Sequence, residues 1–115
     1  MSEINAISAS LTKTSRRLAV ASNLCSRACR AAAESRTDYD LAWAEALLTA
    51  KGDTVDERRA STTIACKDVM RKARLDEAVR DALKARVRTL ESILTATQSK
   101  ASMLRSEMRL TDRAY

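Results

Sequence analysis

The chain has 115 residues, a formal net charge of +6, no histidine, no proline and one glycine. Without histidine it lacks the usual general base, the usual metal ligand and any histidine-containing catalytic triad. A single glycine is too few for a phosphate-cradling loop. We therefore expect no enzymatic activity, no cofactor and no bound metal.

The composition predicts an all-α protein. Nearly every helix breaker is missing, and good helix formers such as Ala, Arg, Leu and Glu dominate. The core should be thin because there is no phenylalanine and small apolar side chains bury little area each. Partner chains would supply further burial for long amphipathic helices. We expect one domain over residues 1–115, a long helical hairpin or coiled-coil-like bundle that forms a homo-oligomer.

The first helix is predicted over residues 3–35. Its apolar or small residues recur in alternating steps of three and four, which is the heptad spacing of a coiled-coil seam. These positions are Ile4, Ile7, Leu11, Thr14, Leu18, Ala21, Cys25, Ala28 and Ala32. Beyond residue 35 the repeat loses phase, and Thr37 with Asp40 has the spacing of a weak capping box. A bend or break is expected there.

A short second helix is predicted over residues 39–50. Tyr39, Trp43 and Leu47 are spaced four apart and share one face. The two aromatic rings could stack on unpaired bases, as in single-strand binders. The largest side chains of an alanine-rich protein are more often packing anchors, so the packing role is favoured.

Residues 51–54 form the strongest turn signal in the chain. Gly52 tolerates positive φ and suits the position just after a helix. Thr54 followed by Glu57 has the spacing of a capping box that opens the next helix. A helical hairpin is therefore expected at this point.

The third helix is predicted over about residues 55–110, where no glycine or proline interrupts the chain. Whether it is straight or broken between Thr63 and Leu75 stays open. Its apolar positions settle into alternating steps of three and four, again the spacing of a coiled coil. We expect this seam to mediate oligomerisation. The residues predicted for that role are Leu83, Val87, Leu90, Leu94, Leu104 and Met108.

The three cysteines, an odd number without a signal-like stretch, indicate a reducing compartment, and a cytoplasmic location is expected. Cys25, Cys29 and Cys66 could supply three thiolates, but a zinc site needs a fourth ligand and usually a tighter spacing. Asp38 and Asp40 fall on different helix faces, which argues against a metal there. No apolar run approaches the roughly 20 residues that cross a bilayer, so no membrane partner is expected.

Basic residues recur at helical spacing and predict ridges of positive charge that could follow a phosphate backbone. Interleaved acidic residues such as Asp68, Asp76 and Asp81 also permit an ordinary solvated, salt-bridged surface. The residues predicted to bind nucleic acid are Lys13, Arg16, Arg17, Lys67, Arg71, Lys72, Arg74, Arg80, Lys84 and Arg88.

Part of the chain resembles small helical proteins of tailed phages, some of them similar to phage recombination mediators. The resemblance covers roughly residues 37–110. The residues that carry it are Tyr39, Trp43, Ala44, Glu45, Ala46, Leu47, Gly52, Val55, Glu57, Arg58, Ala60, Leu90, Leu94, Gln98, Leu104 and Glu107. It implies a ring-like or bundled homo-oligomer that binds single-stranded DNA non-specifically and contacts a recombinase and a single-strand-binding protein.

The leading hypothesis is thus a non-enzymatic, DNA-binding accessory protein for phage recombination or replication, located in the host cytoplasm if phage-encoded. The alternative is a coiled-coil protein-interaction module, or a phage inhibitor of a host protein complex, that does not bind DNA. An apolar stripe that stays exposed after self-assembly would favour the alternative. Salt-sensitive binding to single strands would favour the first.

Overall fold

The computed structural model describes residues 2–114, which form three helices and no strand, so the all-α prediction is confirmed. The helices are α1 (Ser2–Leu48), α2 (Val55–Ala65) and α3 (Lys67–Ala114). The chain divides into two compact units. Unit 1 comprises Met1–Leu24 and Lys84–Tyr115, and unit 2 comprises Cys25–Leu83.

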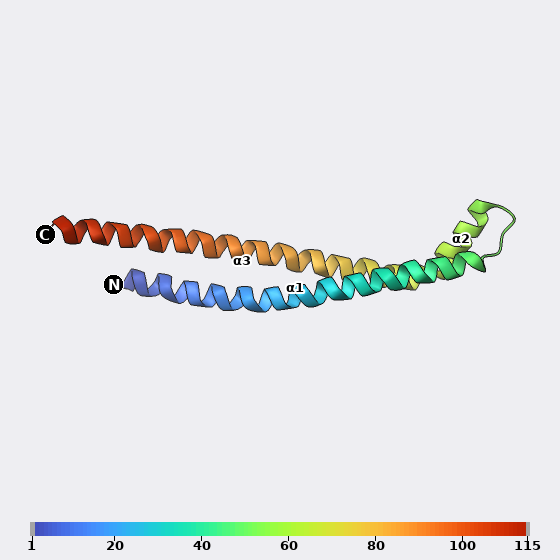
Figure 1. Ribbon diagram of the computed structural model, residues 1–115, viewed down its shortest axis with the longest axis horizontal. Coiled ribbons are helices and arrows are strands. Elements are labelled where there is room, and N and C mark those ends of the chain that lie inside the picture. Colours follow the sequence, from blue (N-terminus) through green and yellow to red (C-terminus); the bar gives the residue numbers. More distant parts are fainter. Residues whose placement is uncertain (1, 115) are drawn as a thin grey trace. The chain divides into compact units, whose positions relative to one another are not determined.

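In unit 1 the first turns of α1 lie beside the last turns of α3, blue against orange and red in Figure 1. The two segments are antiparallel, because Ile4 lies near Leu104 while Arg17 lies near Arg86. The buried residues come from the two apolar repeats predicted from the sequence. They are Ile7, Thr14 and Ala21 of α1, and Leu90 and Ala101 of α3.

Unit 2 is built from the second half of α1, the connection, α2 and the first turns of α3. Its buried residues are almost all small, which lets two helix backbones approach closely. They are Ala28, Ala32 and Ser35 of α1, Thr62 of α2, Cys66 between α2 and α3, and Ala73 of α3. The core is therefore narrow, as the composition predicted.

The break expected between residues 35 and 39 is wrong, because α1 continues without interruption from Ser2 to Leu48. Ser35 is a seam residue itself: its side chain is 2% exposed and hydrogen-bonds to α3. The Thr37 hydroxyl does not cap a new helix but donates to the carbonyl of Ala33, 3.0 Å away. Both polar side chains are thus satisfied within a continuing helix.

The helix expected over residues 55–110 is interrupted, because α2 ends at Ala65 and α3 begins at Lys67. This break lies between Thr63 and Leu75, where the sequence left the continuity of the helix open. Just before this break, the hydroxyls of Thr62 and Thr63 donate to the carbonyls of Arg58 and Arg59, at 2.8 and 2.9 Å. Such back-bonding tends to bend helices, and β-branched residues have lower helix propensity. Cys66 marks the break, with φ −99° and ψ 9°.

Thr54 is the N-cap of α2, as predicted, but the reciprocal bond of the capping box goes to Asp53, one residue before the cap. The Thr54 hydroxyl accepts from the backbone N–H of Glu57 at 3.1 Å, and the Glu57 carboxylate accepts from the N–H of Asp53 at 2.8 Å. Gly52 has a positive φ of 151°, although it lies four residues after Leu48, the last residue of α1. A Cβ at Gly52 would come within 2.8 Å of the Glu57 Cβ, so this turn requires glycine.

Candidate nucleic-acid interface

The net positive charge of the chain is confined to unit 1. Unit 1 contains ten Lys or Arg side chains and four Asp or Glu, whereas unit 2 contains eleven of each. Unit 1 therefore carries the whole net charge of +6, and unit 2 is neutral. All ten basic side chains of unit 1 are exposed. An exposed, predominantly basic surface of this kind attracts polyanions.

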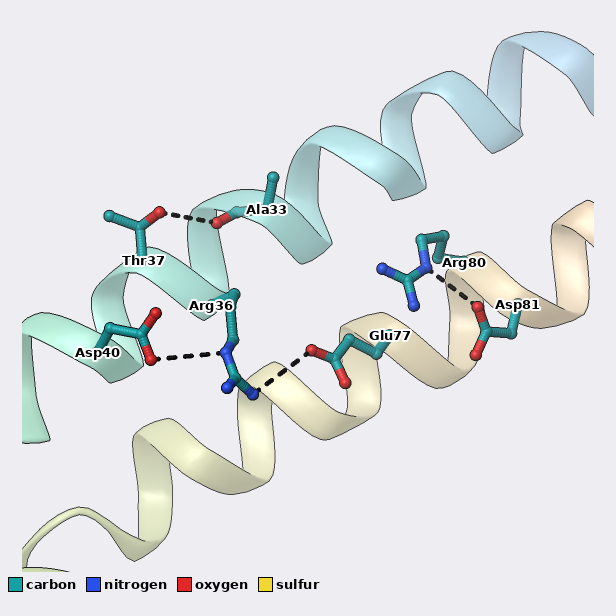
Figure 2. Close-up of polar contacts among 7 residues, drawn as sticks. All are labelled: Ala33, Arg36, Thr37, Asp40, Glu77, Arg80 and Asp81. Atoms are coloured by element: carbon teal, nitrogen blue, oxygen red, sulfur yellow. Dashed lines mark hydrogen bonds and ion pairs between the residues drawn. The ribbon is translucent and has the colours of Figure 1, made fainter.

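The ion pairs are confined to unit 2. Figure 2 shows Arg36 of α1 paired with Asp40 and with Glu77 of α3, and Arg80 paired with Asp81. The nitrogen–oxygen distances are 3.5, 4.0 and 3.0 Å. Lys72 pairs with Asp76 at 3.0 Å. Within residues 2–114 no ion pair involves a residue of unit 1. Within this range, the basic side chains of unit 1 therefore form no ion pair with an acidic side chain.

Three arginines of unit 1 surround a shallow hollow of about 340 Å³ between α1 and α3. Arg16 and Arg17 come from α1, and Arg86 comes from α3. Apolar side chains also line it, among them Val20 and Leu24, which are 60% and 44% exposed. A neighbouring hollow on α1 is also lined by Arg16 and Arg17 and adds Lys13. We call these six residues the basic groove.

The groove has the chemistry to hold a phosphodiester chain. Guanidinium groups donate paired hydrogen bonds to phosphate oxygens, and their charge adds a long-range attraction. Val20 and Leu24 offer apolar contact to sugars or bases. No aromatic ring lines the groove within the described residues, so base stacking does not contribute. These contacts carry no sequence information, and binding would depend strongly on salt.

The structure divides the predicted binding residues between the two units. Lys13, Arg16, Arg17, Lys84 and Arg88 lie in unit 1, and the first three belong to the basic groove. By helical periodicity, Lys84 and Arg88 lie on the opposite side of the α3 seam from Arg86. The predicted residues of unit 2 are Lys67, Arg71, Lys72, Arg74 and Arg80.

Arg86 belongs to the groove. In the sequence it is one of the basic residues of the third predicted helix, but it was not assigned to a binding face with the others. Its position between Lys84 and Arg88 shows only that this part of α3 is basic. The side of α3 that meets Arg16 and Arg17 becomes evident only once α1 is placed against it. The sequence does not show how the two helices pair, and this is why it does not place Arg86 beside Arg16 and Arg17.

Lys72 has a structural role that the sequence did not reveal. Its ammonium group donates to the Ser35 hydroxyl at 3.1 Å and to the Asp76 carboxylate at 3.0 Å. The Ser35 hydroxyl in turn donates to Asp76 in a short hydrogen bond. This polar triad links α1 to α3 inside unit 2. Its hydrogen bonds, first from Ser35 and then from Lys72, hold the pKa of Asp76 below its ordinary value.

The lowered pKa of Asp76 predicts a loss of stability in acid. A carboxyl group whose pKa is lower in the folded state stabilises the fold above its unfolded pKa, near 4, and this contribution disappears as pH falls through the folded value. We expect Asp76→Asn to remove that dependence. Urea unfolding from pH 7 to pH 2 would show wild-type and variant stabilities converging in acid. Parallel curves would contradict the assignment, and Asp68→Asn, an exposed site on the same helix, is the control.

The residues predicted for oligomerisation lie mostly within the packing of a single chain. Leu90 is buried, Leu83, Val87, Leu94 and Leu104 are half-buried, and Met108 is 43% exposed. Much of this seam is thus covered by α1 of the same chain. Its role between chains stays a prediction.

The aromatic pair singled out in the sequence lies in α1 and contacts a neighbouring arginine. Tyr39 and Trp43 are half-buried with ring centroids 6.3 Å apart, and the Arg36 guanidinium lies 5.5 Å from the Tyr39 ring.

Cys25 and Cys29 are half-buried. Over residues 2–114 no three His, Cys, Asp or Glu side chains are grouped as a metal site requires. No helix in this range combines the length and the apolar character of a membrane span.

Comparisons with protein-family models, with curated proteins and with solved structures found no match to this chain.

Proposed function

We propose that the protein is a non-enzymatic accessory factor that binds single-stranded DNA through the basic groove, in a phage recombination or replication process. The observation that carries the proposal is the confinement of the net charge of +6 to unit 1, where no described side chain forms an ion pair. An excess of exposed positive charge on one surface attracts polyanionic ligands and raises their local concentration. The proposed location is the cytoplasm.

The preference for single strands rests on the apolar residues of the groove. Val20 and Leu24 are exposed between the arginines, where they can contact bases that a single strand leaves unpaired. A duplex hides these apolar surfaces and offers the groove only its phosphates. A homo-oligomer, a recombinase and a single-strand-binding protein are proposed as protein partners.

Fluorescence anisotropy with a labelled oligothymidylate at two salt concentrations tests this proposal. If the four basic residues of the groove each contact a phosphate, log affinity should fall by about 2.8 per tenfold rise in salt, at roughly 0.7 per contact. A duplex of equal length should compete poorly. Absence of binding at low salt would refute the proposal, and equal competition by the duplex would refute the single-strand preference.

A second candidate function is a protein-interaction module, including an inhibitor of a host protein complex. It is favoured by large apolar side chains on the neutral unit 2, among them Val55, Ile64 and Leu75, which are 62%, 71% and 61% exposed. A pull-down from nuclease-treated lysate distinguishes the two functions. One stoichiometric protein partner, together with indifference to DNA, would favour this candidate.

A further inference from the structure

Unit 1 contains a second hollow besides the basic groove. It lies between α1 and α3 and has a volume of about 150 Å³. Most of the residues that line it are apolar, namely Ile4, Ile7 and Leu11 of α1 and Ala101 and Leu104 of α3. Ile7 and Ala101 are buried, and the other three are half-buried. We call this hollow the apolar cavity.

Two polar side chains complete the apolar cavity, one from each helix. Ser8 of α1 and Arg105 of α3 are both exposed, so they lie at its open side. Within residues 2–114 Arg105 forms no ion pair. An apolar hollow with a few polar groups is the usual form of a site for a small organic ligand. The guanidinium at its edge favours a ligand that carries a phosphate or a carboxylate.

The apolar cavity adjoins the basic groove. Ser8 also lines the hollow on α1 that contains Lys13, Arg16 and Arg17. Along the helix axis Ser8 lies about 7.5 Å from Lys13, at a rise of about 1.5 Å per residue. All of these residues belong to unit 1. A strand whose phosphates follow the basic groove can therefore pass the open side of the apolar cavity.

We propose that the apolar cavity takes up one unpaired pyrimidine base of a single strand whose phosphates lie in the basic groove. This inference deepens the proposed function and rests on it. An apolar cavity of about 150 Å³ is large enough to bind benzene, and a pyrimidine is likewise a single six-membered ring. The fused rings of a purine require more space. In a duplex a base is paired and stacked, and it must be flipped out before it can enter.

The polar edge of the base would face the two polar side chains. The Ser8 hydroxyl donates or accepts a hydrogen bond, and the Arg105 guanidinium donates to a base carbonyl or to the adjacent phosphate. These bonds matter because burying the edge of a base without partners is costly. The faces of the ring would contact Ile7 and Leu104. The apolar cavity would thus provide the base contact that aromatic side chains supply in other single-strand binders.

Three labelled oligomers of equal length separate uptake of a base from binding of phosphates. One is fully abasic, and the other two carry a single central thymidine or a single central deoxyadenosine. All three have the same phosphates, so the basic groove alone should bind them equally. Because burial of a ring is favourable, fluorescence anisotropy should show the thymidine oligomer binding at least about fivefold more tightly than the abasic one. The deoxyadenosine oligomer should gain less than about twofold.

Ala101→Leu tests the apolar cavity itself, because a larger side chain at this buried position occupies the space that the base would use. The gain from the thymidine should fall to less than about twofold. The slope of log affinity against log salt concentration should stay unchanged, since no charge is lost. Ala96→Leu is the matched control, because Ala96 is an exposed alanine of α3 in unit 1 that does not line the cavity. Circular dichroism verifies that both variants are folded.

Photo-crosslinking of the wild-type chain is a second measurement that requires no variant. A thiothymidine replaces the single thymidine, and irradiation followed by peptide mapping locates the residues to which it becomes attached. Attachment within residues 4–11 or 101–105 is expected, because these segments line the apolar cavity. Attachment only near Val20 and Leu24 would overturn the inference, since the base would then lie in the basic groove.

The results distinguish this inference from the proposed function. Equal affinity for the abasic and thymidine oligomers, an equal gain from deoxyadenosine, or an undiminished gain in Ala101→Leu would overturn uptake of a pyrimidine. Binding of DNA through the basic groove would then still stand. A chain that binds none of the three oligomers at low salt would refute the proposed function and this inference with it.

Discussion

Ala32→Glu should severely destabilise unit 2. The Ala32 side chain is 1% exposed in the narrow contact that α1 makes within this unit. A glutamate there must either bury its carboxyl group or force the helices apart. Burying an unpaired neutral polar group costs about 2–7 kcal/mol, and burying an ionised carboxylate costs more. Urea unfolding followed by circular dichroism should show a midpoint far below that of wild type, or a chain unfolded without urea.

Ala33→Glu is the matched control for this prediction. Ala33 is the next residue of α1, has the same side chain and is exposed. The same substitution there should change the free energy of unfolding by no more than about 0.5 kcal/mol. Equal losses at both positions would mean that close packing of small residues does not stabilise unit 2.

Sequence periodicity predicted the elements whose determinants are local or repeat along one helix. The apolar repeats contain most of the buried residues of unit 1, from Ile7 to Ala101. The N-cap bond between Thr54 and Glu57 was predictable because both partners lie within one turn of each other. Local chemistry of this kind requires no knowledge of tertiary contacts.

The two differences from the expected helix bounds arise where a local signal depends on tertiary context. Ser35 interrupts the apolar repeat in the sequence, yet it is satisfied by Lys72 and Asp76 across the helix pair and α1 continues. Cys66 has no helix-breaking character, yet the helix stops there, after back-bonded threonines, with its side chain 3% exposed. Hydrogen bonds to distant residues therefore explain why α1 continues through Ser35. The break at Cys66 coincides with the burial of its side chain.

The candidate binding site was predictable in charge but not in position. Lys13, Arg16 and Arg17 were identified because they lie close together on one helix. Arg86 completes the groove from a helix roughly 70 residues further along the chain, and periodicity alone does not indicate which helix faces meet. Likewise, the neutrality of unit 2 emerges only when its acidic and basic side chains are assigned to one compact unit.

Replacing the three groove arginines by alanine should nearly abolish binding of single-stranded DNA. Each charged hydrogen bond to phosphate contributes about 1.5–3 kcal/mol when formed, so loss of Arg16, Arg17 and Arg86 should weaken binding by roughly 100-fold or more at low salt. The slope of log affinity against log salt concentration should become shallower by about 2.1, at roughly 0.7 for each of the three lost contacts. Fluorescence anisotropy with labelled oligothymidylate gives both quantities.

A triple alanine variant of Lys67, Arg71 and Arg74 is the matched comparison, because it removes the same charge from exposed positions of unit 2. Its affinity should fall by less than about threefold, since acidic side chains already neutralise that unit and salt screens exposed charges that do not contact the ligand. A larger loss in this variant would move the binding site to unit 2. Equal losses in both variants would show that DNA responds only to total charge, and the groove would then have no special role.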